Sequence, residues 1–154
     1  MLNRLRERMG REEGFTLVEL LVVMLILGIL AAIAIPSFFA QRDKARDADA
    51  KASVRAAETA METYAVDNNG SYASATDANL EAIEETLDAG TLDVTSTADT
   101  YSVQVNSDTD NAFRISRAAN GDVTLTCGDD TTAVGAAFTT GGGDGGCPSS
   151  RTWG

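Results

Sequence analysis

The sequence predicts an α+β fold in which a long N-terminal α-helix packs on a small antiparallel β-sheet. Three observations predict it: an apolar stretch near the N-terminus, a helix-forming segment after it, and short alternating segments in the C-terminal half. We expect a cleaved basic leader at residues 1–14, the long helix at 15–68 and a globular head at 69–154. The 154 residues correspond to one domain, and its soluble core is small.

The charge of the chain excludes several classes of function. The formal net charge is −11 and the chain has no histidine. Residues 1–14 carry four arginines and three glutamates, a net of +1, so residues 15–154 carry −12. Such an acidic body argues against direct nucleic-acid binding through bulk charge. Without histidine no nucleophile has an evident base, so we expect no enzyme, no catalytic residue, no metal site and no cofactor.

The first expected element is a membrane-spanning helix over residues 15–35. Residues 20–35 are all apolar or glycine, and extension back to residue 15 gives 21 residues interrupted only by Thr16 and Glu19. About 20 residues cross the hydrocarbon core of a bilayer. The arginines before this stretch predict a cytoplasmic N-terminus. Basic residues on its far side weaken that prediction: Arg42, Lys44 and Arg46.

The second half of the helix is predicted to be amphipathic. After Pro36, apolar residues recur at spacings of four and three: Ala50, Val54, Ala57, Met61 and Tyr64. The string at residues 68–70, Asn-Asn-Gly, can end the helix because these residues tolerate the left-handed conformation. A continuous helix over residues 15–67 would be about 80 Å long, so its first half needs a membrane or another chain along it.

Residues 71–98 are expected to form a loop with one short helix. Asp77 can cap this helix, and Gly90 can end it. The apolar stripe of the helix is Leu80, Ile83 and Leu87.

The apolar period then changes to two, which predicts strands at residues 101–105, 113–117 and 123–127. The segment "TAVGAAF" at 132–138 is expected to add a weaker fourth strand. A two-residue turn between the last two predicted strands would set apolar residues opposite polar ones. We expect instead a three-residue loop at 119–121, with Gly121 left-handed, which pairs Ile115 with Leu125 and Phe113 with Cys127.

The two cysteines, Cys127 and Cys147, predict a disulfide, because an even pair near the end of an exported chain is typical of one. The alternative is two free buried thiols. A disulfide would tie the glycine-rich segment at 141–146 back to the sheet and contribute on the order of 3 kcal/mol.

The stretch "GFTLVELLVVMLILGILAAIAIP" resembles the class III signal of type IV pilins and the related pseudopilins. A short basic leader ends in Gly14, Phe15 follows it, Glu19 is the fifth residue after the Gly14–Phe15 junction, and Pro36 closes the apolar run. The resemblance covers roughly residues 1–40. Beyond them only the general plan is similar: a long helix, a loop, an antiparallel sheet and a disulfide-closed C-terminal region.

The resemblance implies that a prepilin peptidase cleaves between Gly14 and Phe15 and methylates the new amine of Phe15. That amine lies at the positive end of a helix dipole and needs a counter-charge. The resemblance implies that Glu19 of a neighbouring subunit supplies it and thereby sets the axial register of a filament. In the alternative, Glu19 is only a helix-start glutamate favoured by the dipole.

Gly28 and Pro36 lie at the two ends of a segment in which the helix is expected to be weak, because proline lacks a backbone hydrogen-bond donor. The resemblance implies a helix break there in assembled filaments. Gly28 has a second explanation, since a glycine also permits close packing of helices.

The resemblance implies a structural subunit of a type IV pilus, a homo-oligomeric helical filament for adhesion, twitching motility or DNA uptake. Its implied partners are the peptidase, an assembly platform, and assembly and retraction ATPases. The precursor would lie in the cytoplasmic membrane with its N-terminus inside, and the filament on the cell surface.

The alternative is the major pseudopilin of a type II secretion system, an envelope piston. That family usually carries an aspartate-rich calcium loop near a Trp-Gly-Asn-Pro-like string, which this sequence lacks, so we favour the pilin. A third possibility is a secreted protein cleaved after a signal peptide near residues 32–34, Ala-Ile-Ala. Glu19 inside the apolar region argues against it.

Overall fold

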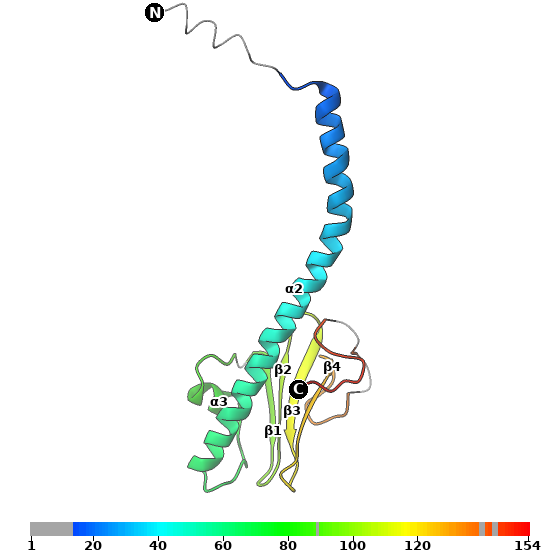
Figure 1. The fold of residues 1–154 in the computed structure, drawn as a ribbon. Helices are drawn as coiled ribbons and strands as arrows, with labels where there is room; N and C mark the ends of the chain where they lie inside the picture. Colours follow the sequence, from blue (N-terminus) through cyan, green and yellow to red (C-terminus); the bar gives the residue numbers. More distant parts are fainter. Residues whose placement is uncertain (1–13, 89, 139–140, 143–144) are drawn as a thin grey trace, which may run out of the picture. The chain divides into compact units, whose positions relative to one another are not determined.

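The computed structural model describes residues 14–88, 90–138, 141–142 and 145–154, and it confirms the predicted fold class (Figure 1). The chain forms two compact units, which meet between Phe39 and Ala40. The predicted leader, apart from Gly14, lies outside the described residues. The helices and strands are α2 (Leu17–Asp67), α3 (Asp77–Ile83), β1 (Leu92–Ser96), β2 (Tyr101–Asn106), β3 (Asn111–Arg117) and β4 (Val123–Asp129).

The second half of helix α2 buries the predicted apolar stripe. Ala50, Val54, Ala57 and Met61 are buried, and the partly buried Tyr64 packs against the same core. The helix ends at Asp67, as expected, because Asn69 and Gly70 have φ angles of 58° and 84°. These left-handed conformations end the helical hydrogen-bond pattern.

Helix α2 is continuous through Gly28 and Pro36 in this single chain. Proline at position 36 cannot donate the hydrogen bond that would reach the carbonyl of Ala32. The missing bond weakens the helix locally but does not end it. The helix break was expected for the assembled filament, and it stays a prediction for that state.

The four strands form one antiparallel sheet in the order β1-β2-β3-β4. The register of β3 and β4 pairs Ile115 with Leu125 and Phe113 with Cys127, which confirms the predicted register. The loop between them is also as predicted. Gly121 has φ 89°, and its N–H donates to the carbonyl of Ala118 over 2.9 Å.

The predicted fourth strand at residues 132–138 is wrong, because that segment contains no strand. Gly135 has φ 86°, so the backbone turns there instead of extending. The fourth strand of the sheet is β1, in a region expected to be loop. It pairs Leu92 with Val105 and Val94 with Val103 of β2.

Helix α3 differs from its prediction at both ends. Its N-cap is Thr76, not Asp77, because Thr76 and Asn79 form a reciprocal pair of hydrogen bonds between each side chain and the other's backbone N–H. The helix ends at Ile83, well before Gly90. Of the predicted stripe, Leu80 and Leu87 are buried, whereas the side chain of Ile83 is exposed.

The core of the second unit lies between helix α2 and one face of the sheet. Val103, Phe113 and Ile115 are fully buried there, and Trp153 meets Phe113 edge-on with ring centroids 5.8 Å apart. The opposite face of the sheet is polar, with cross-strand rows of residues: Thr95, Ser102, Ser116 and Thr124, then Asp93, Gln104, Arg114 and Thr126.

Candidate assembly site

The first half of helix α2 is an exposed apolar surface. An 18-residue window of this helix has a mean hydropathy of 2.9, and none of that window is buried. All residues from 17 to 39 are exposed in the single chain, Ile33 to 73%. Soluble monomers rarely expose so large an apolar patch, so this surface needs an apolar environment. By length and composition, the helix can cross a membrane.

The residues of the predicted cleavage junction precede the helix. Gly14, Phe15 and Thr16 are not helical, and Phe15 is 83% exposed. No described atom lies within 4 Å of the place where a Cβ on Gly14 would be. No residue that the structure describes therefore covers the bond between Gly14 and Phe15.

Thr16 caps the start of the helix and places Glu19 in its first turn. The N–H of Glu19 donates to the Thr16 hydroxyl over 3.2 Å, and the N–H of Leu20 donates to the Thr16 carbonyl over 3.2 Å. Sequence reasoning missed Thr16, although "TLVE" matches a capping-box pattern. These two hydrogen bonds order the first turn of the helix, from Thr16 to Leu20.

The carboxylate of Glu19 has no hydrogen-bond or ion-pair partner within the described part of the chain, and the residue is exposed on the helix. A carboxylate in the first turn is favoured by the helix dipole. In an apolar environment, however, an ionised carboxylate is costly without a specific partner. The structure thus places Phe15 just before the start of helix α2 and Glu19 in its first turn.

In the second unit, Asp47 is a buried carboxylate that sequence reasoning missed. It is fully buried, and its Oδ1 accepts hydrogen bonds from the hydroxyls of Ser107, over 2.7 Å, and Thr109. Its Oδ2 accepts from Asn111 Nδ2 over 3.1 Å and from the Gly146 N–H over 2.6 Å. Asp47 therefore joins helix α2 to the β2–β3 turn and to the C-terminal loop.

The glycines at 145 and 146 allow the C-terminal loop to approach Asp47. A Cβ on Gly146 would lie 2.7 Å from the Asp47 Cβ, and Gly145 has φ 57°. One turn along the helix, Lys51 Nζ donates to the Gly146 carbonyl over 2.6 Å. A side chain at either glycine would push the loop away from the helix.

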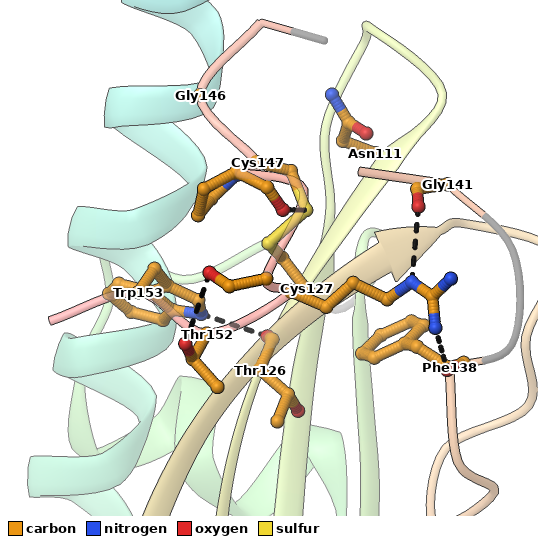
Figure 2. The surroundings of a disulfide bond; sticks show 12 residues. Asn111, Thr126, Cys127, Phe138, Gly141, Gly146, Cys147, Thr152 and Trp153 are labelled. Atoms are coloured by element: carbon orange, nitrogen blue, oxygen red, sulfur yellow. Dashed lines mark hydrogen bonds between the residues drawn. A yellow bond between two sulfur atoms is a disulfide. The ribbon is translucent and has the colours of Figure 1, made fainter. Parts of the chain in front are cut away.

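The disulfide between Cys127 and Cys147 is present, so the alternative of two free thiols is wrong (Figure 2). Both residues are buried, and their Cα atoms lie 5.8 Å apart. The chain after the disulfide returns to strand β4. Thr152 forms an isolated bridge with Thr126, and the indole N–H of Trp153 donates to the Thr126 carbonyl over 2.8 Å. The C-terminal segment thus covers part of the β4 edge.

A second carboxylate, Glu62 of helix α2, binds two tyrosines. Tyr72 and Tyr101 donate their hydroxyls to it over 2.9 and 3.1 Å, and Arg117 Nη1 lies 3.5 Å from Glu62 Oε1. Burial, and then the charge of Glu62, raise the pKa of Tyr101 well above its ordinary value. The cluster holds the end of α2 against the loop and strand that follow it.

Comparisons with known proteins identify the N-terminal segment. The family model described as the prokaryotic N-terminal methylation motif matches residues 9–35, which span the Gly14–Phe15 junction and Glu19. No solved structure matches the chain.

The curated relatives also match through part of the chain. Type II secretion system core protein G of Vibrio cholerae is 39% identical over 77 residues, which are 50% of this chain and 51% of the relative. The type IV wide pilus major component PilA4 of Thermus thermophilus is 46% identical over 66 residues, 43% of this chain and 50% of the relative.

The type IV major pilin protein PilA of Myxococcus xanthus is 44% identical over 54 residues, 35% of this chain and 24% of the relative. The chain thus spans about a quarter to a half of the length of these relatives. Over its N-terminal part the chain carries the N-terminal methylation motif and is similar both to type IV pilins and to type II secretion core proteins G.

Proposed function

We propose that the chain is a structural subunit of a type IV pilus and polymerises through the first half of helix α2. One observation carries the proposal: an apolar helix surface, exposed along its whole length, carries a carboxylate without a described partner one turn from Phe15. Copies of the same helix can cover that surface and can also provide the missing positive charge.

The precursor is anchored in the cytoplasmic membrane with its leader inside. A prepilin peptidase cleaves the Gly14–Phe15 bond and methylates the amine of Phe15. The match of the methylation motif to residues 9–35 supports this step. Cleavage removes the four leader arginines and leaves a single positive amine at the tip of an apolar helix.

In the filament, Glu19 of one subunit pairs with the Phe15 amine of a neighbour. Such a pair stabilises both charges inside an apolar bundle, where each alone would be costly. Because every subunit carries one amine and one carboxylate at a fixed spacing, the pairing also sets the axial register. The heads of the filament form its outer surface, which serves adhesion, twitching motility or DNA uptake. Separate assembly and retraction ATPases drive the filament.

The second candidate function is the major pseudopilin of a type II secretion system. It is favoured by the names of the relatives, because type II secretion core proteins G are more numerous among them than type IV pilins. The disulfide-closed C-terminal loop favours the pilin.

Mass spectrometry of the N-terminal peptide separates the two candidates. We expect a peptide that begins at methylated Phe15 in filaments sheared from the surface of producing cells. The same peptide found in the membrane fraction only, without surface filaments, would assign the chain to the secretion pseudopilus. A peptide that begins after residue 34 would contradict both and indicate a secreted soluble protein.

A further inference from the structure

Residues 56–154 are strongly acidic, and their few cations are not evenly placed. They contain sixteen aspartates and glutamates but only three basic residues: Arg114, Arg117 and Arg151. Two of the three, Arg114 and Arg151, line the same cavity, which has a volume of about 280 Å³. The cavity lies over strand β4, on the polar face of the sheet.

Arg114 is a buried cation with neutral partners. It is 4% exposed, and its guanidinium donates to Gln104 Oε1 and to the carbonyls of Ala133 and Ala136. It also lies 4.1 Å from the ring centroid of Phe138. Burial lowers the pKa of Arg114, and the charge of Asp93 offsets part of that effect. Among the described residues, no carboxylate forms a salt bridge with it.

Arg151 has a left-handed backbone, with φ 56°, which is uncommon for a residue with a side chain. Its Nε donates to the Gly141 carbonyl and its Nη1 to the Phe138 carbonyl, each over 3.2 Å. A guanidinium has five N–H donors. Two are used here, so three make no hydrogen bond to residues that the structure describes.

The rest of the cavity lining is suited to an anion. Three hydroxyl residues complete its polar lining: Thr126, Ser150 and Thr152. The lining formed by described residues includes no aspartate or glutamate. Guanidinium groups bind the oxygens of phosphates through charge-assisted hydrogen bonds, and hydroxyls add neutral donors.

We propose that this cavity binds a phosphate group, held by the spare N–H donors of Arg151 and by the surrounding hydroxyls. The charge of Arg114, whose guanidinium already makes four hydrogen bonds within the chain, attracts the anion. The phosphate is either the free ion or the terminal group of a larger molecule. The site lies within the head, and it does not depend on the proposed assembly function. In the free chain, three N–H donors of Arg151 have no partner among the described residues, and the buried charge of Arg114 raises the electrostatic potential of the cavity.

The test is a titration of the full chain, in a non-ionic detergent, with inorganic phosphate at constant ionic strength. NMR of the arginine Nε–H groups reports the site directly in the unaltered protein. We expect the signals of Arg151 and Arg114 to shift saturably, whereas that of Arg117, which pairs with Glu62, stays in place. Chloride at the same ionic strength should not reproduce the shift. No saturable shift, or an equal shift with chloride, would overturn the proposal.

Variants test the same point. Arg151→Gln should weaken phosphate binding by about tenfold or more, because it removes a charge-assisted donor set. Arg117→Gln removes the same charge from the head outside this cavity, and it should leave the affinity unchanged. Equal affinities of Arg151→Gln and the wild type would refute the site.

Methyl phosphate distinguishes the two possible sources of the phosphate group. If methyl phosphate binds at least as tightly as inorganic phosphate, the ligand is the terminal phosphate of a larger molecule. If inorganic phosphate alone binds, the ligand is the free ion.

Discussion

At the scale of single residues, Asp47 shows how one buried carboxylate can join three distant segments. Its partners Ser107 and Gly146 lie 60 and 99 positions away in the sequence. Hydrogen bonds to a charged group each contribute about 1.5–3 kcal/mol, and a buried donor left without its acceptor costs a similar amount. The sequence gives only one sign of this role: Asp47 lies one turn before Ala50, on the same helix face as Ala50 and Val54.

We predict that Asp47→Ala lowers the free energy of unfolding of the head by about 3 kcal/mol, because it leaves four donors without their acceptor. Urea unfolding of the full chain in non-ionic detergent measures this through Trp153, the one tryptophan of the chain, which is buried in the head. The matched control is Asp49→Ala at an exposed position, which should change stability by less than about 0.5 kcal/mol. Similar losses for the two variants would show that Asp47 has no special role.

Tyr101 predicts an alkaline limit to stability. Because burial and Glu62 raise its pKa above the ordinary 10.0, the folded chain keeps the phenolic proton where the unfolded chain releases it. This contribution is fully present below pH 10 and is lost as the pH rises above it. We expect the free energy of unfolding to fall with a smaller slope above pH 10 in Tyr101→Phe than in the wild type. Equal slopes in urea titrations at a series of pH values would contradict this assignment.

At the scale of elements, short-range patterns were predictable and long-range partners were not. The β3–β4 register followed from the sequence, because the apolar residues of both strands must share one face and "AANG" supplies the turn. Strand β1 was missed because its two apolar residues, Leu92 and Val94, are too few to set a pattern. Its conformation depends on pairing with β2.

The same contrast holds for the two candidate sites. The N-terminal methylation motif could be found in the sequence because Gly14, Phe15 and Glu19 lie within six residues of one another. The contacts of Asp47 and the cavity of Arg114 and Arg151 could not be predicted from the sequence. In both cases residues that are far apart in the chain come together only in the fold. The segment at 132–138 is apolar enough to suggest a strand, but its carbonyls bind Arg114 and Gln104 on the polar face of the sheet.

The disulfide loop is predicted to be the main covalent support of the head. Replacement of both cysteines by alanine, Cys127→Ala with Cys147→Ala, should lower the free energy of unfolding by about 3 kcal/mol, because the unfolded chain is no longer constrained. It should leave the helical far-ultraviolet circular dichroism of α2 in place. An unfolding free energy within about 0.5 kcal/mol of the wild type would contradict this role.

At the scale of the whole molecule, the chain combines a small, well-packed head with an apolar helix segment that no described residue covers. The core of the second unit is closed by α2, the sheet, the disulfide and Trp153. The surface of residues 17–39 is exposed and almost entirely apolar. An acidic head resists non-specific association, so the apolar helix is the part of the molecule that is suited to assembly.

The proposed pairing of Glu19 with the Phe15 amine of a neighbouring subunit predicts that assembly fails without this carboxylate. The most direct measurement is the yield of filaments sheared from cells that produce Glu19→Ala, with cleavage at Gly14 followed on the same samples. We expect cleaved protein but a loss of nearly all filaments. Thr16→Val is the matched control, since it removes the helix cap but keeps the carboxylate, and it should still assemble. Filaments of Glu19→Ala at the wild-type yield would contradict the pairing. An equal loss of filaments in Thr16→Val would indicate that Glu19 acts only at the start of the helix.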